Sequence, residues 1–358
     1  MQSTNYQRIA FFLPNWIGDL VMATPAIAAV AQKYPQAELI AIGKPYVFAT
    51  LSGNPWFSHN IMLDKKGPPE QRARAVIRQL KALSPDAAVL FPNSFRAAWI
   101  AWRAGCRQRI GFVRYARGLL LTDKFYHQRG RFGKPIPMPV IDDYNRLIAP
   151  LGITNPDCRM QLFTTADEEQ SADALWTKLG LNRYKTVICI NSSGAFGAAK
   201  LWPSAHFAEL AKKLLQHLPD AAVLVVCGPN EKKIAEEITS TANDPRVISL
   251  ANEKVSIGLT KACIRRSQML ISTDSGPRHF GAAFGIPVVS LFGPTHIEWT
   301  DTHYVDEVHL QKKVPCGPCQ KRVCPLDHRC MTQLSSEEVL TTALDLFQRA
   351  KRRKVPLA

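Results

Sequence analysis

The sequence of 358 residues contains no apolar run of about 18 residues, the length that a membrane-spanning helix requires. A secretory signal peptide is excluded as well, because the short apolar run Ile9–Leu13 is followed at once by Pro14, Asn15 and Asp19. We therefore expect a cytoplasmic protein. Its length is sufficient for two hydrophobic cores, since a single core rarely grows beyond about 250–300 residues.

Signatures of several nucleotide-binding and nucleic-acid-binding proteins are missing. No G-x-G-x-x-G follows the first predicted strand of either half, which argues against a nicotinamide-dependent enzyme. Lys200 is not followed by Ser or Thr in a G-x-x-x-x-G-K pattern, so the chain has no P-loop. No zinc-finger or helix-turn-helix pattern occurs, which leaves a nucleic-acid-binding module as the weaker alternative to an enzyme.

Acidic residues are scarce, with 29 Asp and Glu against 45 Lys and Arg and a formal net charge of +16. The imbalance is strongest in the segment Arg96–Lys134, which holds ten basic residues and one acidic residue, Asp123. A local excess of that size attracts an anionic partner, which could be nucleic acid, a membrane surface or an acidic substrate. General solubility is the alternative explanation of the charge.

The nine cysteines fall into two groups. Five are scattered through apolar or helical segments, where a reduced thiol behaves as a small buried hydrophobic group: Cys106, Cys158, Cys189, Cys227 and Cys263. The other four have C-x2-C-x4-C-x5-C spacing: Cys316, Cys319, Cys324 and Cys330. Four thiolates can hold a zinc ion, but the last two spacings differ from those of common zinc ribbons. Packed reduced thiols or a labile disulfide are therefore the favoured alternative.

Apolar runs alternate with helical patterns along the chain, which predicts parallel α/β architecture in both halves. Strands are predicted at Arg8–Leu13, Glu38–Ile42, Ala87–Phe91, Thr186–Ile190, Ala221–Cys227, Gln268–Ser272 and Pro287–Phe292. Helices are predicted at Asp19–Val30, Gln71–Leu83, Ala172–Leu179, His206–Leu218 and Ser335–Arg353, the last with a capping box. The polar stretch Thr164–Ser171 places the boundary between an N-terminal domain, residues 1–175, and a C-terminal domain, residues 176–358.

Three polar motifs follow predicted strands, at the strand ends where ligands bind in an open α/β sheet. The first is Pro14–Asp19, in which Gly18 permits close approach of a substrate and the Asp19 carboxylate can act as a general base. A helix N-cap is the structural alternative for Asp19, and the motif alone favours that alternative.

The second motif, Asn191–Pro203, combines small residues, hydroxyl groups and Lys200, a set of groups that suits a diphosphate. A loop without a functional role is equally compatible with that composition. The third motif, Thr273–His279, leads from a strand into a helix N-terminus, which can bind an anion through free N–H groups and the helix dipole. For His279 alone, a buried structural histidine is the favoured interpretation.

In this order, the motifs resemble those of glycosyltransferase family 9. The matching stretches are Asn15–Asp19, Lys200–Pro203, Asp274–His279 and Pro287–Thr295, and the resemblance covers nearly the whole chain. The cysteine segment Cys316–Met331 is similar to the heptosyltransferase II branch of the family. The resemblance implies a GT-B fold, with two Rossmann-like, doubly wound parallel-sheet domains and an interdomain cleft. The final helix is a candidate to pack back on the N-terminal domain.

The resemblance also implies an activity, the inverting, metal-independent transfer of heptose from ADP-L-glycero-D-manno-heptose to the first heptose of the lipopolysaccharide inner core. Another donor or acceptor, used by an enzyme of the same family, is the alternative. No cofactor is implied, since ADP-heptose is a substrate. The implied partners are ADP-heptose, the phosphorylated and heptosylated Kdo2-lipid A acceptor, and the cytoplasmic face of the inner membrane, to which the protein would bind peripherally. Nucleic acid is not among them.

The resemblance assigns roles to individual residues. Asp19 is the implied base for the acceptor hydroxyl. The implied donor-binding residues are Ser192, Ser193, Lys200, Glu231, Asp274, Ser275, Gly276 and His279. Among them, Lys200 would contact the diphosphate, Asp274 the heptose and Glu231 the ribose. Candidate acceptor contacts are Gly18, Arg114 and Arg117, the two arginines being chosen from the basic segment.

Overall fold

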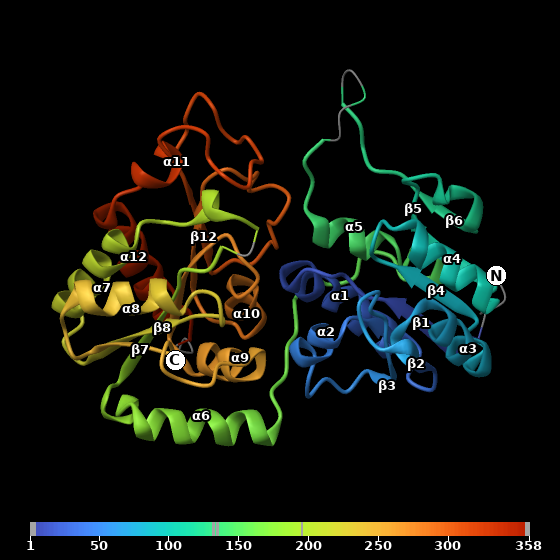
Figure 1. Cartoon of the computed structure of the whole chain (residues 1–358), viewed down its shortest axis with the longest axis horizontal. Helices are drawn as coiled ribbons and strands as arrows, with labels where there is room; N and C mark the ends of the chain where they lie inside the picture. The colour runs from blue at the N-terminus through green and yellow to red at the C-terminus, as the bar shows by residue number, and fades with distance from the viewer. Residues whose placement is uncertain (1–4, 131–132, 134–135, 195, 355–358) are drawn as a thin grey trace. The chain divides into compact units, whose positions relative to one another are not determined.

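The computed structural model describes residues 5–130, 133, 136–194 and 196–354, and it consists of two units (Figure 1). The first unit comprises Met1–Phe163 and the short return segment Glu298–His303, and the second comprises Thr164–Ile297 and Tyr304–Ala358. Lys134, the last residue of the basic segment, and Ala195 of the second motif lie outside the described residues.

The first unit contains a six-stranded parallel sheet with the strand order β3-β2-β1-β4-β5-β6. The strands are β1 (Arg8–Phe12), β2 (Glu38–Gly43), β3 (Phe57–Met62), β4 (Ala87–Leu90), β5 (Gln108–Phe112) and β6 (Asp123–Phe125). The helices are α1 (Ile17–Lys33), α2 (Pro45–Thr50), α3 (Ala73–Leu83), α4 (Phe95–Ala104) and α5 (Val140–Arg146). Because the strand order reverses between β1 and β4, the loops after these two strands form the switch point at which such sheets bind ligands.

The second unit repeats this arrangement with a six-stranded parallel sheet of order β12-β11-β10-β7-β8-β9. The strands are β7 (Thr186–Asn191), β8 (Ala221–Val226), β9 (Val247–Ser249), β10 (Met269–Thr273), β11 (Val288–Phe292) and β12 (Glu307–Gln311). The helices are α6 (Ala166–Lys178), α7 (Ser204–His217), α8 (Lys232–Ala242), α9 (Ile257–Arg266), α10 (Arg278–Ala283), α11 (Arg329–Thr332) and α12 (Ser336–Lys354). Read from β9 to β12, this strand order corresponds to the order of the first sheet read from β3 to β6. The switch point of the second sheet therefore lies between β7 and β10.

Continuous apolar strands form the centre of both sheets, because helices cover both faces of a parallel sheet. Every residue of β8, β10 and β11 is buried, and so is every residue of β1 after Arg8. All seven predicted strands are present, each displaced by at most one residue at an end. The α/β prediction is therefore confirmed in both halves. Within the described residues, no helix has the length and apolar composition needed to cross a membrane.

The domain boundary and helix α6 differ from the prediction. Helix α6 begins at Ala166 because a capping box opens it, in which the Thr165 hydroxyl accepts from the Glu168 N–H and the Glu168 carboxylate accepts from the Thr165 N–H. The units separate at Phe163, so a boundary after residue 175 would cut α6. Helix α12 belongs to the second unit, where it contacts α7, β11 and β12, and the segment that returns to the first unit is Glu298–His303.

The prediction that Arg117 contacts the acceptor is wrong, because the Arg117 side chain is fully buried. The guanidinium donates to the carbonyl oxygen of Phe112 at 2.7 Å, to the Asn93 amide oxygen at 3.0 Å and to the carbonyl oxygen of Pro92. Burial lowers the pKa of Arg117 to about 10, which leaves it charged at neutral pH. Arg117 therefore holds the loop after β4 against the end of β5, and it is not available as an acceptor contact.

Replacing Arg117 with Ala should lower the free energy of unfolding by about 3 kcal/mol or more, because it removes several hydrogen bonds to a charged group and leaves buried carbonyl oxygens without donors. Arg114→Ala is the matched control. Its side chain is exposed, so the change should stay within about 0.5 kcal/mol. Urea unfolding followed by circular dichroism measures both values, and a small effect of equal size in the two variants would contradict the structural role of Arg117.

Candidate active site

Asp19 lies in the first turn of α1, directly beyond the carboxyl end of β1. The N-cap of this helix is Trp16, so the N-cap alternative for Asp19 is wrong. Gly18 and Asp19 are both partly exposed. Burial, followed by the charges of Asp19 and Asp143, raises the pKa of Tyr144 on α5 well above its ordinary value, which places the two carboxylates near this phenol. Asp19 thus presents a carboxylate at the switch point of the first sheet.

A pocket of about 450 Å³ opens at the same edge of the first sheet. Its lining includes Asn93, Arg114 and His127, which follow β4, β5 and β6 respectively. Apolar side chains such as Ile136 and Trp299 complete the wall. Arg114 is therefore the predicted acceptor residue that the structure places in a pocket.

His127 and Asp143 are pocket residues that the sequence analysis missed. The His127 Nδ1 lies 2.9 Å from a carboxylate oxygen of Asp143, whose other oxygen accepts from Arg146 at 3.0 Å. The His127 ring also stacks on Phe112 with a centroid distance of 4.2 Å. The imidazole is thus held in one orientation, which is the arrangement that suits a hydrogen bond to a ligand. The signal in the sequence was a histidine two residues after β6, a strand of three residues that was not predicted.

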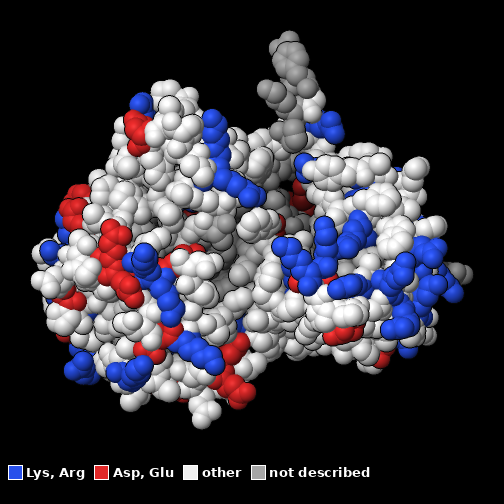
Figure 2. All heavy atoms as spheres, in the orientation of Figure 1, with Lys and Arg blue, Asp and Glu red and all other residues white. Residues whose placement is uncertain are grey.

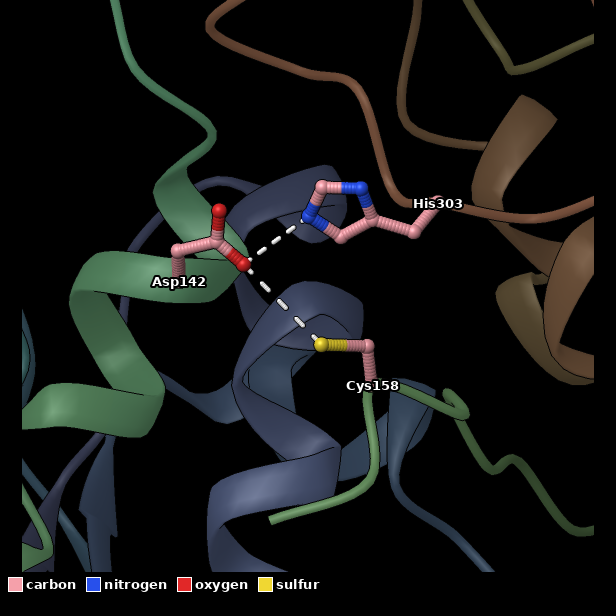
Figure 3. Close-up of side chains that lie close together, drawn as sticks. All are labelled: Asp142, Cys158 and His303. Carbon is pink, nitrogen blue, oxygen red and sulfur yellow. Dashed lines mark hydrogen bonds and ion pairs between the residues drawn. The ribbon is translucent and has the colours of Figure 1, made fainter. Parts of the chain in front are cut away.

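A second polar group in the first unit consists of Asp142, Cys158 and His303, whose side chains point toward one another (Figure 3). The His303 Nε2 lies 2.9 Å from the Asp142 Oδ1, and the Cys158 Sγ lies 3.9 Å from the same oxygen. Cys158 is only partly buried, which differs from the buried position predicted for it. These are ligand types that zinc accepts. The hydrogen bond between Asp142 and His303 already fixes the return segment to the first unit without an ion.

In the second unit, Lys200 and Asp274 form a buried ion pair at the switch point. The Lys200 Nζ lies 2.5 Å from the Asp274 Oδ2, and the side chains are 11% and 5% exposed. Thr295, which follows β11, donates its hydroxyl to the same carboxylate oxygen at 2.6 Å. Burial alone would raise the pKa of Asp274, but the charges of Lys200 and Arg278 lower it below its ordinary value. The pair therefore stays ionised where the loops after β7, β10 and β11 meet.

Two serines follow β7, the strand next to β10 in the sheet. Ser192 and Ser193 are buried at the end of β7, and the Ser192 hydroxyl has no hydrogen-bond partner among the described residues. The Asn191 amide donates to Ser275 at 2.7 Å, which fixes the start of the loop after β10. Helix α10 has six residues, so the phosphate assignment rests on Lys200 and the serines rather than on a helix dipole at Gly276. An unpartnered buried hydroxyl in this loop needs an explanation, and a ligand that accepts its proton would provide one.

The cysteine segment supports the loop that carries Lys200. The Ala199 N–H donates to the Arg322 carbonyl oxygen at 3.0 Å, and the His328 Nε2 lies 2.8 Å from the Ala199 carbonyl oxygen. Gly197 is required at this contact, since a Cβ atom there would lie 2.3 Å from the Arg322 carbonyl oxygen. Among the described residues, only Asp142, Cys158 and His303 bring three metal-ligand atoms within 4.8 Å of one another, so the four thiols after residue 315 form no such group.

Glu231 and His279, the remaining predicted donor-binding side chains, differ in their surroundings. The Glu231 carboxylate accepts from the Gly228 N–H at 2.7 Å, in the loop after β8. His279 is only 3% exposed, and its Nδ1 has no hydrogen-bond partner in the part of the chain that the structure describes. Burial, with a further contribution from the charge of Arg278, lowers the pKa of His279 to about 3. His279 is thus buried and neutral, but its unpartnered Nδ1 atom differs from the satisfied buried histidine of the alternative interpretation, and its donor-binding role stays a prediction.

The pH dependence of stability should report on His279. Since its folded pKa lies below that of an unfolded histidine, the unfolded chain gains a proton first, and stability is lost as the pH falls from about 6.5. Between pH 6.5 and 4.5, the wild type should lose up to about 1.4 kcal/mol per pH unit relative to His279→Gln. Urea unfolding of both proteins from pH 8 to 4.5 measures this difference. Parallel stability curves would show that His279 is protonated in the folded state.

Comparisons with known proteins agree with the resemblance drawn from the motifs. The family model described as "Glycosyltransferase family 9 (heptosyltransferase)" matches residues 73–329. The chain is 24% identical over 355 residues to lipooligosaccharide heptosyltransferase 2 of Campylobacter jejuni, covering 95% of this chain and 98% of that protein. It is 26% identical over 295 residues to lipopolysaccharide heptosyltransferase 2 of Escherichia coli K12, covering 80% and 83%.

Solved structures with the same fold include a glycosyl transferase of family 9 from Veillonella parvula, with a TM-score of 0.81, 19% identity and coverage of 97% of this chain and 99% of that one. E. coli ADP-heptose lps heptosyltransferase II gives a TM-score of 0.77, 22% identity and coverage of 96% and 99%. The expected α/β fold of GT-B type, with two Rossmann-like units, is thereby confirmed. Because the family model covers more than half of the chain, this protein is a transferase enzyme that belongs to glycosyltransferase family 9.

Proposed function

We propose that this enzyme transfers heptose from ADP-L-glycero-D-manno-heptose to a heptose of the lipopolysaccharide inner core, with inversion and without a metal ion or cofactor. The observation that carries the proposal is the buried pair of Lys200 and Asp274, with the unpartnered Ser192 hydroxyl, at the switch point of the second sheet. The names of the similar proteins from Campylobacter jejuni and E. coli support heptose as the transferred sugar.

The donor is activated by charge in the second unit. Departure of ADP builds negative charge on the diphosphate, and Lys200 supplies a positive charge that Asp274 already holds in position. In this proposal the Ser192 and Ser193 hydroxyls add donors, and Asp274 accepts from a sugar hydroxyl. Such preorganised donors each lower a barrier by about 2.7–4 kcal/mol in a site that excludes water. This arrangement replaces the metal ion that other transferases use to neutralise a leaving diphosphate.

The acceptor is activated by Asp19. Its carboxylate takes the proton of the acceptor hydroxyl while the hydroxyl oxygen attacks the anomeric carbon of the heptose. Attack occurs on the face opposite the diphosphate, so the bond from the anomeric carbon to the phosphate oxygen breaks and ADP leaves. One carboxylate is sufficient for this single displacement, which inverts the anomeric carbon.

The pocket of the first unit suits a phosphorylated sugar acceptor. Arg114 and His127 supply a charge and a hydrogen-bonding group, and Trp299 supplies an apolar surface for a sugar ring. The acceptor would be the heptosylated Kdo2-lipid A core, which is lipid-linked. We accordingly place the enzyme at the cytoplasmic face of the inner membrane as a peripheral protein, and we assign no nucleic-acid partner.

Replacing Asp19 with Asn should reduce turnover by about 100-fold or more, because it removes the general base while keeping the side-chain shape. The affinity for ADP should stay unchanged, since ADP is assigned to the other unit. The measurement is transfer from ADP-heptose to a mono-heptosylated core acceptor, with mass analysis of the product. Asp157→Asn, at an exposed carboxylate, is the control. Full activity of Asp19→Asn would reject the base, and a wild type that uses only UDP-sugars would reject the donor.

Protein purified without a chelator should contain no stoichiometric zinc, because the four C-terminal thiols, all among the described residues, do not gather within 4.8 Å of one another and the hydrogen bond between Asp142 and His303 forms without an ion. Elemental analysis of the wild type tests this expectation. A molar ratio of zinc to protein near one would contradict it. The variants Cys158→Ser and Cys316→Ser would then identify which of the two thiol-containing groups holds the ion.

A further inference from the structure

Basic side chains gather on the face of the first unit that carries α3 and α4 (Figure 2). Helices α3 and α4 pack against each other. The exposed cations on and beside them are Arg72, Arg74, Arg78, Lys81, Arg96, Arg103, Arg107 and Arg114. Among the described residues, none of these side chains forms an ion pair, whereas Arg246 and Arg266 of the second unit are each paired with a carboxylate. This face therefore carries an uncompensated positive charge.

Large apolar side chains are exposed on the same face. We call Phe95, Trp102, Tyr115 and Leu119 the apolar patch. Their exposed fractions are 48%, 47%, 66% and 92%. Phe95 and Trp102 are seven positions apart on α4 and so share one side of the helix. Leu119 lies in the 3-10 turn Arg117–Leu120, which packs against α4. Exposed side chains of this size grouped together mark an interaction surface.

The local structure holds these groups outward. Tyr115 and Ala116 both have positive φ values, 50° and 60°, a backbone conformation that costs free energy for residues other than glycine. Buried Arg117 fixes the turn through its bonds to Pro92 and Asn93 in the loop before α4. The guanidinium groups of Arg103 and Arg114 lie over the rings of Trp102 and Tyr115, at 5.9 and 4.8 Å from the ring centroids. Two of the cations thus lie directly on aromatic rings of the apolar patch.

We propose that this surface, comprising the apolar patch and the cations around it, docks the enzyme on an anionic lipid bilayer. Tryptophan and tyrosine prefer the boundary between headgroups and hydrocarbon, aliphatic side chains insert below it, and arginines bind anionic headgroups. Nucleic acid would pair with the cations but offers no apolar layer for Leu119. The proposal deepens the proposed function, on which it rests for the lipid-linked acceptor. Arg114 links the pocket to the apolar patch, because it lines the pocket and its guanidinium lies over the ring of Tyr115.

Flotation of the full chain with vesicles of phosphatidylglycerol and phosphatidylethanolamine, compared with vesicles of phosphatidylcholine, tests the proposal. The wild type should bind the anionic vesicles at least tenfold more strongly, with a blue shift of its tryptophan emission. The double variant Trp102→Ser/Leu119→Ser should lose at least tenfold in binding, and Arg96→Glu/Arg103→Glu should lose as much. The matched control is Val323→Ser/Leu326→Ser, which removes two exposed apolar side chains of the second unit and should bind within twofold of the wild type.

Vesicle binding and activity on two acceptor preparations distinguish a failure of the docking surface from a failure of the proposed heptose transfer. Vesicle binding needs no turnover, so a patch-dependent interaction supports the docking surface even if heptose transfer is absent. The patch variants should keep full activity on acceptor dispersed in detergent and lose it on acceptor embedded in vesicles. Equal vesicle binding by the wild type and Trp102→Ser/Leu119→Ser would overturn the proposal. Tighter binding of the wild type to duplex DNA than to anionic vesicles would overturn it as well.

Discussion

The buried ion pair between Lys200 and Asp274 is the interaction around which the second unit is organised. Burying two charges is a poor means of gaining stability, since well-packed apolar residues would serve the fold equally well. The pair is nevertheless retained at the switch point, and it is surrounded by polar groups from three successive strand ends. Thr295 binds the carboxylate, and the cysteine segment supports the loop that carries the lysine. Because parallel sheets bind ligands at such a switch point, our proposal assigns the pair to a charged ligand.

The repeated strand order explains why each unit carries polar groups at one edge. In both sheets the order reverses once, so two loops separate there and leave their polar side chains accessible. The first unit places a carboxylate, Asp19, at this edge, together with a pocket that contains Arg114 and His127. The second unit places cations and hydroxyl groups there. The same architecture thus supports two kinds of chemistry, because the loops differ while the sheets do not.

The strands predicted from the sequence are those whose burial requires a continuous run of apolar residues. Central strands such as β1 and β8 are apolar on both faces, so they are visible as continuous runs. Five strands were not predicted: β6 and β9 have only three residues each, while β3, β5 and β12 are longer but include partly buried or exposed positions. The motifs at Asp19, Lys200 and Asp274 were found because they follow predicted strands. The contacts between these residues could not be predicted, because strand order decides which residues distant in sequence come together.

Charge alone did not distinguish a structural arginine from an exposed one. Arg114 and Arg117 are three positions apart in the same basic segment, yet one lines the pocket and the other is buried under a turn. The carbonyl oxygens that accept from Arg117 belong to Phe112 at the end of β5 and to Pro92 in the loop after β4, and no sequence pattern brings these two segments together. The partial exposure of Cys158 and the pocket position of His127 were not predicted for a similar reason. Cys158 contacts Asp142 and His127 contacts Asp143, and both aspartates lie on α5, a helix that was not predicted.

The affinity for ADP tests the central role of the ion pair most directly. Isothermal titration should compare the wild type with the double variant Lys200→Met/Asp274→Asn, which removes both charges and so avoids leaving one of them buried alone. Lys212→Met, at an exposed lysine of the same unit, is the control. The account predicts that the Kd for ADP rises about tenfold or more in the double variant and is unchanged in the control. An unchanged Kd in the double variant would contradict it.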